Sequence, residues 1–332
     1  MAQAVGVQGS AERPRQPRTV RDVGEFGLIE RITSLLGSQP ALVRLGPGDD
    51  AAVVATPGGS VVVSTDLLVH GRHFRLDWSS PYEVGRKAAA QNLADIAAMG
   101  AVGTALLVGL AVPSALPLDV ADGLVAGLRD EAAATGAGVV GGDVVAADDL
   151  VVAVTALGDL QGRSPVTRAG ARPGDSVVVA GRLGCAAAGM RLLSAGERDH
   201  PMAALHRCPA PPYALGVQLA RAGATAMIDI SDGLVADLGH VAQASGVRIV
   251  LDVESLSAAF ARGPVTPADV LAGGEDHALA ATLPAGTPAP AGCLEVGAAQ
   301  APGDGEGARV VDARTGAALA VAGFDHFGGG SV

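Results

Sequence analysis

Aromatic residues are scarce in this sequence, at 2% of 332 residues, and lysine occurs only once, at Lys87. A core with so few aromatic rings must be built mainly from Ala, Val, Leu and Ile. The sequence has no G-x-x-x-x-G-K-[ST] run, and this absence excludes a P-loop nucleotide site. Any phosphate-binding site must therefore use arginine, backbone N–H groups or metal ions.

Cysteine is also sparse, and long hydrophobic runs are missing. Cys185, Cys208 and Cys293 show no C-x-x-C spacing, which is typical of reduced thiols rather than of a zinc site or a disulfide framework. Residues 1–20 lack the apolar stretch of a secretory signal, and no apolar run is long enough to span a bilayer. We therefore expect a cytoplasmic protein without a membrane partner, in which residues 1–22 form a disordered tail.

The charge balance is acidic, with a formal net charge of −11. Such a charge argues against a nucleic-acid partner or an anionic membrane surface. It still allows polyphosphate ligands, provided that metal ions stand between the two sets of negative charge.

Hydrophobic periodicity and 47 glycines favour α/β layering over a helix bundle. The Gly- and Pro-rich texture of residues 158–175 marks the best candidate for a domain boundary. We expect residues 23–160 to form an N-terminal domain and residues 161–332 a C-terminal α/β domain.

Three local expectations concern strands and loops. Residues 53–54 and 61–66 are predicted to pair as a hairpin, with Ser64, Thr65 and Asp66 at the point where a strand ends. Residues 247–253 are predicted to form one strand. Residues 284–308, rich in Pro, Ala and Gly, are predicted to form a loop.

Acidic residues recur beside glycine or hydroxyl side chains along the chain. Oxygen ligands of this kind suit Mg²⁺, so we predict that several clusters converge on one metal-binding cleft. The clusters are Asp49/Asp50, Ser64/Thr65/Asp66, Asp95, Asp143, Asp229/Ser231/Asp232 and Glu275/Asp276.

Each cluster taken alone has a simpler interpretation, because Asp beside Gly usually forms a turn or caps a helix. Residues 119–126 nearly repeat residues 229–236 but lack the preceding apolar strand, and we assign them to an ordinary surface helix. His73 can be a plain surface histidine, Arg168 a solvated loop arginine, and Phe324 part of a C-terminal hydrophobic plug. Their functional alternatives are a ligand contact, a phosphate clamp and a stacking platform, respectively.

Taken in order, the motifs resemble the thiamine-monophosphate kinase family, part of the superfamily named for aminoimidazole-ribonucleotide synthetase. The likeness spans residues 24 to 327. Its motifs are residues 24–29, 46–51, 64–66, 73–74, 92–100, 141–143, 167–170, 229–239, 273–276 and 324–327.

The resemblance implies a set of site residues. For Mg²⁺ it implies Asp50, Ser64, Thr65, Asp66, Asp95, Asp143, Asp229 and Asp232, of which Asp66, Asp95 and Asp143 would be catalytic. For ATP it implies Gly142, Asp143, Arg168 and Ser231. For thiamine phosphate it implies His73, Glu275 and Phe324. His277 and Phe324 stand at positions where the family usually has Tyr. These two differences affect only the details of substrate contacts and leave the metal assignment unchanged.

The resemblance also implies a fold and an activity. The expected fold is a two-domain α/β (α+β) fold whose N-terminal mixed sheet binds metal and ATP and pairs with a second subunit in a homodimer. The expected activity is ATP-dependent phosphorylation of thiamine monophosphate to thiamine diphosphate, assisted by several Mg²⁺ ions. The alternatives are another ATP-dependent enzyme of the superfamily and a non-catalytic nucleotide- or metal-binding paralogue.

Overall fold

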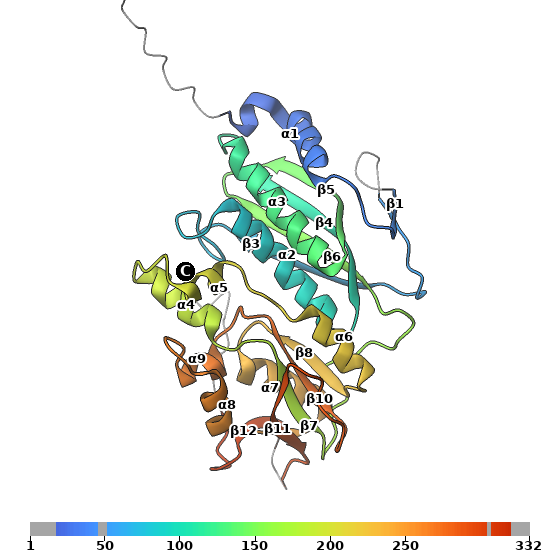
Figure 1. The fold of residues 1–332 in the computed structure, drawn as a ribbon, viewed down its shortest axis with the longest axis vertical. Helices are drawn as coiled ribbons and strands as arrows, with labels where there is room; N and C mark the ends of the chain where they lie inside the picture. Colours follow the sequence, from blue (N-terminus) through green and yellow to red (C-terminus); the bar gives the residue numbers. More distant parts are fainter. Residues whose placement is uncertain (1–17, 46–51, 304–306, 320–332) are drawn as a thin grey trace, which may run out of the picture.

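The computed structural model describes residues 18–45, 52–303 and 307–319 of the chain. Two larger β-sheets, each packed against helices, make the mixed α/β architecture that the sequence predicted (Figure 1). The first sheet is built from residues up to Asp159 and the second from Ser176 onward. A domain division at residues 160–161 is our proposal.

The N-terminal part has three helices and six strands among the described residues. They are α1 (Val20–Leu36), β1 (Val43–Leu45), β2 (Val53–Val54), β3 (Val62–Val69), α2 (Pro81–Ala98), β4 (Val102–Val112), α3 (Leu118–Thr135), β5 (Gly138–Ala146) and β6 (Val151–Asp159).

The C-terminal part follows the linker at residues 160–175 and has its own sheet. Its elements are β7 (Ser176–Ala180), α4 (Cys185–Ser194), α5 (Pro201–Arg207), α6 (Tyr213–Arg221), β8 (Ala226–Ile230), α7 (Leu234–Ser245), β9 (Arg248–Leu251), α8 (Val253–Phe260), α9 (Pro267–Ala272), β10 (Ala278–Leu283), β11 (Cys293–Gln300) and β12 (Arg309–Asp312).

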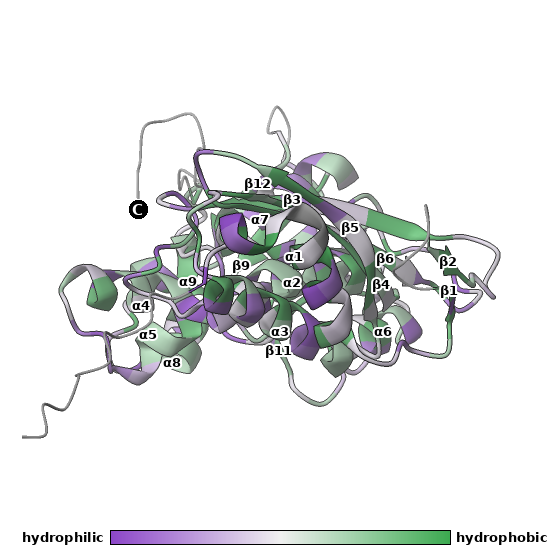
Figure 2. Cartoon of the chain, turned by 90° about the horizontal axis from the view of Figure 1, so that it is seen from above, coloured by the Kyte–Doolittle hydropathy of each residue, from purple (hydrophilic) through white to green (hydrophobic). Residues whose placement is uncertain are grey.

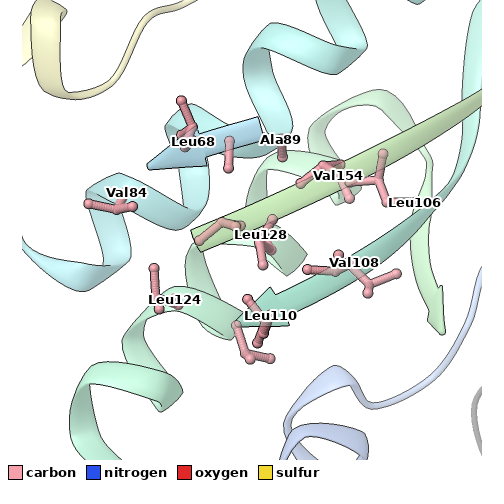
Figure 3. Packing of buried hydrophobic residues seen from close by; sticks show 14 of the residues in the cluster. Leu68, Val84, Ala89, Leu106, Val108, Leu110, Leu124, Leu128 and Val154 are labelled. Atoms are coloured by element: carbon pink, nitrogen blue, oxygen red, sulfur yellow. The ribbon is translucent and has the colours of Figure 1, made fainter. Parts of the chain in front are cut away.

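The N-terminal sheet has the strand order β3-β6-β4-β5, with β4 and β5 parallel and the other pairs antiparallel. Helices α2 and α3 lie side by side on one face (Figures 1 and 3). Leu106, Val108 and Leu110 of β4 point toward that face, where Leu124 of α3 is fully buried. The alternation along β4 therefore leaves Leu107 on the opposite face, where it is exposed.

Helix α2 begins at Pro81 with a capped first turn. Ser80 accepts a hydrogen bond from the Glu83 backbone N–H, and the Glu83 carboxylate accepts one from the Ser80 N–H in return, which closes a capping box. Pro81 occupies the first helical position, where the missing N–H costs nothing.

The C-terminal sheet has the strand order β12-β9-β11-β7-β10-β8. Both of its faces are covered, so that every residue of β10 is buried. One face packs against α7, α8 and α9, and the other packs against α6 and the end of α2, where Ala97 and Ala98 join the same hydrophobic cluster as Met227 and Leu279. Helix α2 thus belongs to the cores of both parts.

Hydropathy follows this layering: hydrophobic residues run along the strands, and hydrophilic residues gather in loops and on stretches of the helices (Figure 2). Among the described residues, no helix combines the length and apolar character needed to cross a membrane. Cys185, Cys208 and Cys293 are all free thiols.

The predicted hairpin is wrong. Strand β2 pairs with β1, whereas β3 pairs with β6, because β3 has a long apolar partner there across eight residues. Strand β3 also continues to Val69, so Asp66 lies within the strand rather than at its end.

Other corrections fall in the C-terminal part and at the first helix. The strand predicted at residues 247–253 ends at Leu251, where Asp252 caps α8. The loop predicted at 284–308 contains β11, which pairs with β7 and β9. Helix α1 begins at Val20, inside the expected tail, and the Val20 N–H donates to the Leu116 carbonyl.

Candidate active site

Two polar contacts join β3 to α2 where the N-terminal sheet meets the C-terminal part. Ser64 Oγ donates a hydrogen bond to Asp95 Oδ2 at 2.6 Å. The Asp66 backbone N–H donates to Asn92 Oδ1 at 2.9 Å, and Asn92 Nδ2 donates to the Ala88 carbonyl. Asn92 is fully buried, so these two bonds satisfy an amide that would otherwise be costly to bury.

The end of β8 brings a further carboxylate to this place. Asp229 is 5% exposed, and its Oδ2 lies 3.3 Å from His277 Nδ1. Burial raises the pKa of Asp95 to about 7, and the negative charges of Asp229 and Asp66 add to this rise. Asp66 and Asp229 therefore both lie close enough to Asp95 for their charges to repel its carboxylate.

The charge of His277 partly offsets the repulsion at Asp95, because it acts to lower the pKa of that carboxyl. Burial alone would lower the pKa of His277, but its contact with Asp229 outweighs burial and raises it. His277 stands where the family usually has Tyr, and we expected this difference to affect only substrate contacts. The structure places it directly against a predicted metal ligand instead.

Asp237 is a member of this acidic group that the sequence analysis missed. It is 2% exposed on the first turn of α7, and its Oδ2 accepts the backbone N–H groups of Asp232 and Gly233, each at 3.1 Å. Burial and the charge of Asp229 raise the pKa of Asp237 to about 7. Its position in the first helical turn after Ser-Asp-Gly was the available signal, since acids there commonly hold the N-terminal N–H groups.

The loops after β8 and before β10 are packed backbone against backbone. The Glu275 N–H donates to the Ser231 carbonyl at 2.8 Å, and the His277 N–H donates to the Ile230 carbonyl. A Cβ on Gly274 would lie 2.3 Å from the Ser231 oxygen, so only glycine allows this approach. Glu275 and His277 both have left-handed backbones, with φ of 65° and 49°, a strain that concentrates at functional sites.

The two predicted substrate residues that the structure describes meet at Lys87. Its Nζ lies 3.2 Å from Glu275 Oε2 and donates to the His73 carbonyl at 3.1 Å. His73 Nδ1 in turn accepts the Val69 N–H. The third predicted substrate residue, Phe324, lies outside the described residues, as do Asp49 and Asp50.

Thr65 is separated from this group by strand alternation. Its hydroxyl contacts Thr155 Oγ1 and donates to the Val154 carbonyl, on the face of the sheet opposite to Ser64 and Asp66. Within one chain the Thr65 hydroxyl therefore lies apart from Ser64 and Asp66, and the role of Thr65 as a metal ligand stays a prediction.

Asp143 and Gly142 lie at the far edge of the same sheet, on β5, with β6 and β4 between them and β3. Asp143 is paired with Gly109, on the face away from α2 and α3. A Cβ on Gly142 would lie 1.8 Å from the Val108 carbonyl oxygen, so close strand packing already accounts for that glycine. Within one chain, the structure does not bring Asp143 to Asp95 and Asp229.

Of the other two predicted ATP contacts, Ser231 lies near Asp229, whereas Arg168 lies in the linker between the two sheets. Ser231 is half-buried beside Asp232 and Asp229. Arg168 is exposed in the linker between the sheets, where its carbonyl accepts a hydrogen bond from Ser245 Oγ.

The donor chemistry fits a hard divalent cation, since carboxylate and hydroxyl oxygens are what Mg²⁺ prefers. As they stand, the described side chains contain no group of three or more His, Cys, Asp or Glu placed to hold a metal ion. A cation here would therefore need further ligands, and Mg²⁺ commonly takes these from substrate phosphates and water.

Comparison with known proteins identifies the class of this fold. Residues 48–160 match the family model of AIR synthase related protein, N-terminal domain. The hydrogenase maturation protein HypE, solved in complex with ATP, has the same fold at a TM-score of 0.70 and 19% identity, over 89% of this chain and 92% of that one. The chain thus has an AIR synthase-like α/β fold, in which Asp66 and Asp229 lie near Asp95 of α2.

Closer relatives define the family. The thiamine-monophosphate kinase of Mycobacterium tuberculosis is 50% identical over 288 residues, which cover 84% of this chain and 86% of that protein. The solved structure of AaThiL complexed with AMPPCP and TMP matches at a TM-score of 0.73 and 31% identity, over 96% of this chain and 100% of that one. The chain belongs to the thiamine-monophosphate kinase family.

Proposed function

We propose that this protein transfers the γ-phosphoryl group of ATP to the phosphate of thiamine monophosphate, giving ADP and thiamine diphosphate. The observation that carries this proposal is the meeting of Ser64, Asp66, Asp95 and Asp229 in a chain 50% identical to a thiamine-monophosphate kinase.

The chemistry suits a site without a general base. The acceptor is already a phosphate oxygen, so no alcohol has to lose a proton before it attacks. The demand is alignment and neutralisation of two anionic substrates, and bound Mg²⁺ supplies that neutralisation. The chain's only lysine is held by Glu275 and the His73 carbonyl, so the phosphates must be neutralised by other groups.

We propose that Asp66, Asp95, Asp229 and Asp232 hold Mg²⁺, with Ser64 fixing the Asp95 carboxylate. The negative charges of Asp229 and Asp66, which add to the effect of burial in raising the pKa of Asp95, support this, because carboxylates that repel one another gain from a shared cation. Asp50 remains a proposed ligand outside the described residues. Ser231 and Arg168 are the proposed ATP contacts of this chain, and His73, Glu275 and Phe324 the proposed contacts of thiamine monophosphate.

We further propose that the protein is a homodimer through the open face of the N-terminal sheet. This face carries apolar side chains that are 39% to 56% exposed, although α2 and α3 bury the other face. Exposed apolar residues gathered on one sheet face mark an interaction surface. They are Val63, Leu67, Leu107 and Val145.

Asp143 lies at this open face, and Gly142 directly precedes it on β5. In such a dimer a second copy covers them, so we propose that they serve the site of the partner subunit. In an isologous dimer this contribution is reciprocal, so each subunit supplies Asp143 and Gly142 to the active site of the other.

Substitution of Leu67 by Arg tests the dimer. A charge on the buried interface should convert the dimer to a monomer, which sedimentation or light scattering measures. Leu294→Arg is the matched control, since Leu294 is 40% exposed on β11, in the other sheet. A dimer that persists in Leu67→Arg would contradict the proposed interface.

A product assay tests the activity. Purified protein with ATP, Mg²⁺ and thiamine monophosphate should give thiamine diphosphate and ADP in equal amounts. ADP formed only with a formylglycinamidine ribonucleotide would indicate an aminoimidazole-ribonucleotide synthetase-like enzyme. Nucleotide binding without any product would indicate a non-catalytic paralogue.

A further inference from the structure

Lys87 is an unusual residue in this chain, because it is the only lysine and is 2% exposed. It projects from the middle of α2, the helix that the cores of both parts share. A buried ammonium is expensive unless it is paired, so its partners are informative.

Its partners come from two distant segments. The Nζ donates to the carbonyl of His73, which follows β3, and pairs with the carboxylate of Glu275, which precedes β10. His206 of α5 completes the group, with Nδ1 at 3.4 Å from the same Glu275 oxygen. One side chain therefore joins an N-terminal segment to a C-terminal segment.

The contact leaves Glu275 available to a ligand. Its side chain is 36% exposed, while Lys87 holds one carboxylate oxygen from the buried side. Burial acts to raise the pKa of Glu275, but the charge and hydrogen bond of Lys87, together with His206 and His277, outweigh burial and lower the pKa, which favours the ionised carboxylate. Glu275 also has a left-handed backbone, a conformation that few non-glycine residues adopt.

Holding the two parts together does not by itself explain Lys87. The same boundary has other ion pairs, namely Arg207 with Glu83 at 2.9 Å and Arg198 with Asp77 at 3.3 Å. Buried ion pairs are also often replaceable by apolar residues without loss of stability. What distinguishes Lys87 is that both of its contacts fix residues proposed to bind the acceptor.

We propose that Lys87 is a positioning residue for the acceptor substrate: it holds Glu275 and the His73 segment in the arrangement that binds thiamine monophosphate. This inference rests on the proposed function. A fixed, ionised carboxylate is suited to a cationic heteroaromatic ring such as thiazolium, which needs a counter-charge rather than a hydrogen-bond donor.

The test separates the two substrates. Lys87→Met should raise the KM for thiamine monophosphate about tenfold or more, as expected for a lost charge-assisted contact, with the KM for ATP changed less than about threefold. Glu275→Gln should show the same selective rise. If Lys87 acts through Glu275, the double variant should be no worse than Glu275→Gln alone.

Arg207→Gln is the matched control. It removes an ion pair of α5 at the same boundary, so it should lower the melting temperature without changing either KM. An equal change of both KM values in Lys87→Met, or effects of Lys87→Met and Glu275→Gln that multiply, would overturn the proposal.

The only tryptophan gives a second readout that does not depend on turnover. Trp78 lies edge-on to His206 with ring centroids 6.4 Å apart, so its fluorescence should change when thiamine monophosphate binds. The titration of the wild-type protein with thiamine monophosphate should saturate, and Lys87→Met should need about tenfold more ligand to reach half-saturation. A folded Lys87→Met variant that binds with wild-type affinity would refute the role of Lys87. If the wild-type protein binds thiamine monophosphate but forms no diphosphate, the proposed function fails while the role of Lys87 can still be judged.

Discussion

The two edges of the N-terminal sheet carry aspartates in similar sequence surroundings but in different tertiary settings. At the β3 edge, Ser64 and Asp66 face α2 and lie beside Asp95 and Asp229. At the β5 edge, Asp143 faces the open side of the sheet, three strands away. An aspartate that closely follows an apolar strand run is therefore a ligand candidate only where the fold supplies opposing oxygens.

The largest expected effect is at the β3 edge. Asp95→Asn should lower kcat about a thousandfold or more, because an amide is a poor ligand for a cation that must neutralise two substrates. The metal-free melting temperature should stay the same or rise, since Asn does not repel Asp229. Both quantities come from the product assay and a thermal melt. Unchanged kcat would remove Asp95 from the metal site.

Metal binding itself should be measurable without substrate. Mg²⁺ at about 100 times its dissociation constant stabilises a one-site protein by about 2.7 kcal/mol, which should raise the melting temperature by several degrees. The shift should vanish in Asp95→Asn and persist in Asp122→Asn, whose carboxylate pairs with Arg31 on the surface. An equal shift in all three proteins would point to a different metal site.

The β5 edge can be tested by mixing subunits. If Asp143 serves the partner's active site, Asp143→Asn and Asp95→Asn should each be inactive, whereas the heterodimer of the two variants contains one intact active site. Its activity should then be about half that of the wild-type dimer. Heterodimers purified on two tags provide the measurement, and a heterodimer as inactive as its parents would place Asp143 outside the partner's site.

The smallest effect is expected at Thr65, and it compares the two faces of one strand. Thr65→Val keeps the size of the side chain and removes only its contacts with Thr155 and the Val154 carbonyl, so kcat should change less than about twofold. Ser64→Ala, the neighbour on the inner face, removes the hydrogen bond to Asp95 and should cost about tenfold. Equal losses in the two variants would contradict the assignment of faces.

Much of the fold followed from local physics. The capping box at Ser80 and Glu83 is a local pattern that starts α2, and the short apolar run after the linker forms β7. The pairing of β2 and β3 could not be predicted from local sequence. Both are apolar runs near a turn, and their actual partners, β1 and β6, are decided by which other strand offers a matching edge. Strand β11 was missed because Pro, Ala and Gly around it hide a pattern that tertiary pairing stabilises.

The acidic motifs and their order can be identified in the sequence, and they were sufficient to indicate the family. The sequence alone also determined that phosphates cannot be held by a P-loop lysine, because the chain has one lysine and no such loop. Only the tertiary structure decided which oxygens meet. Side chains alternate between the faces of a strand, and residues 95 and 229 become neighbours only when two sheets pack on α2, so convergence is a property of packing rather than of spacing.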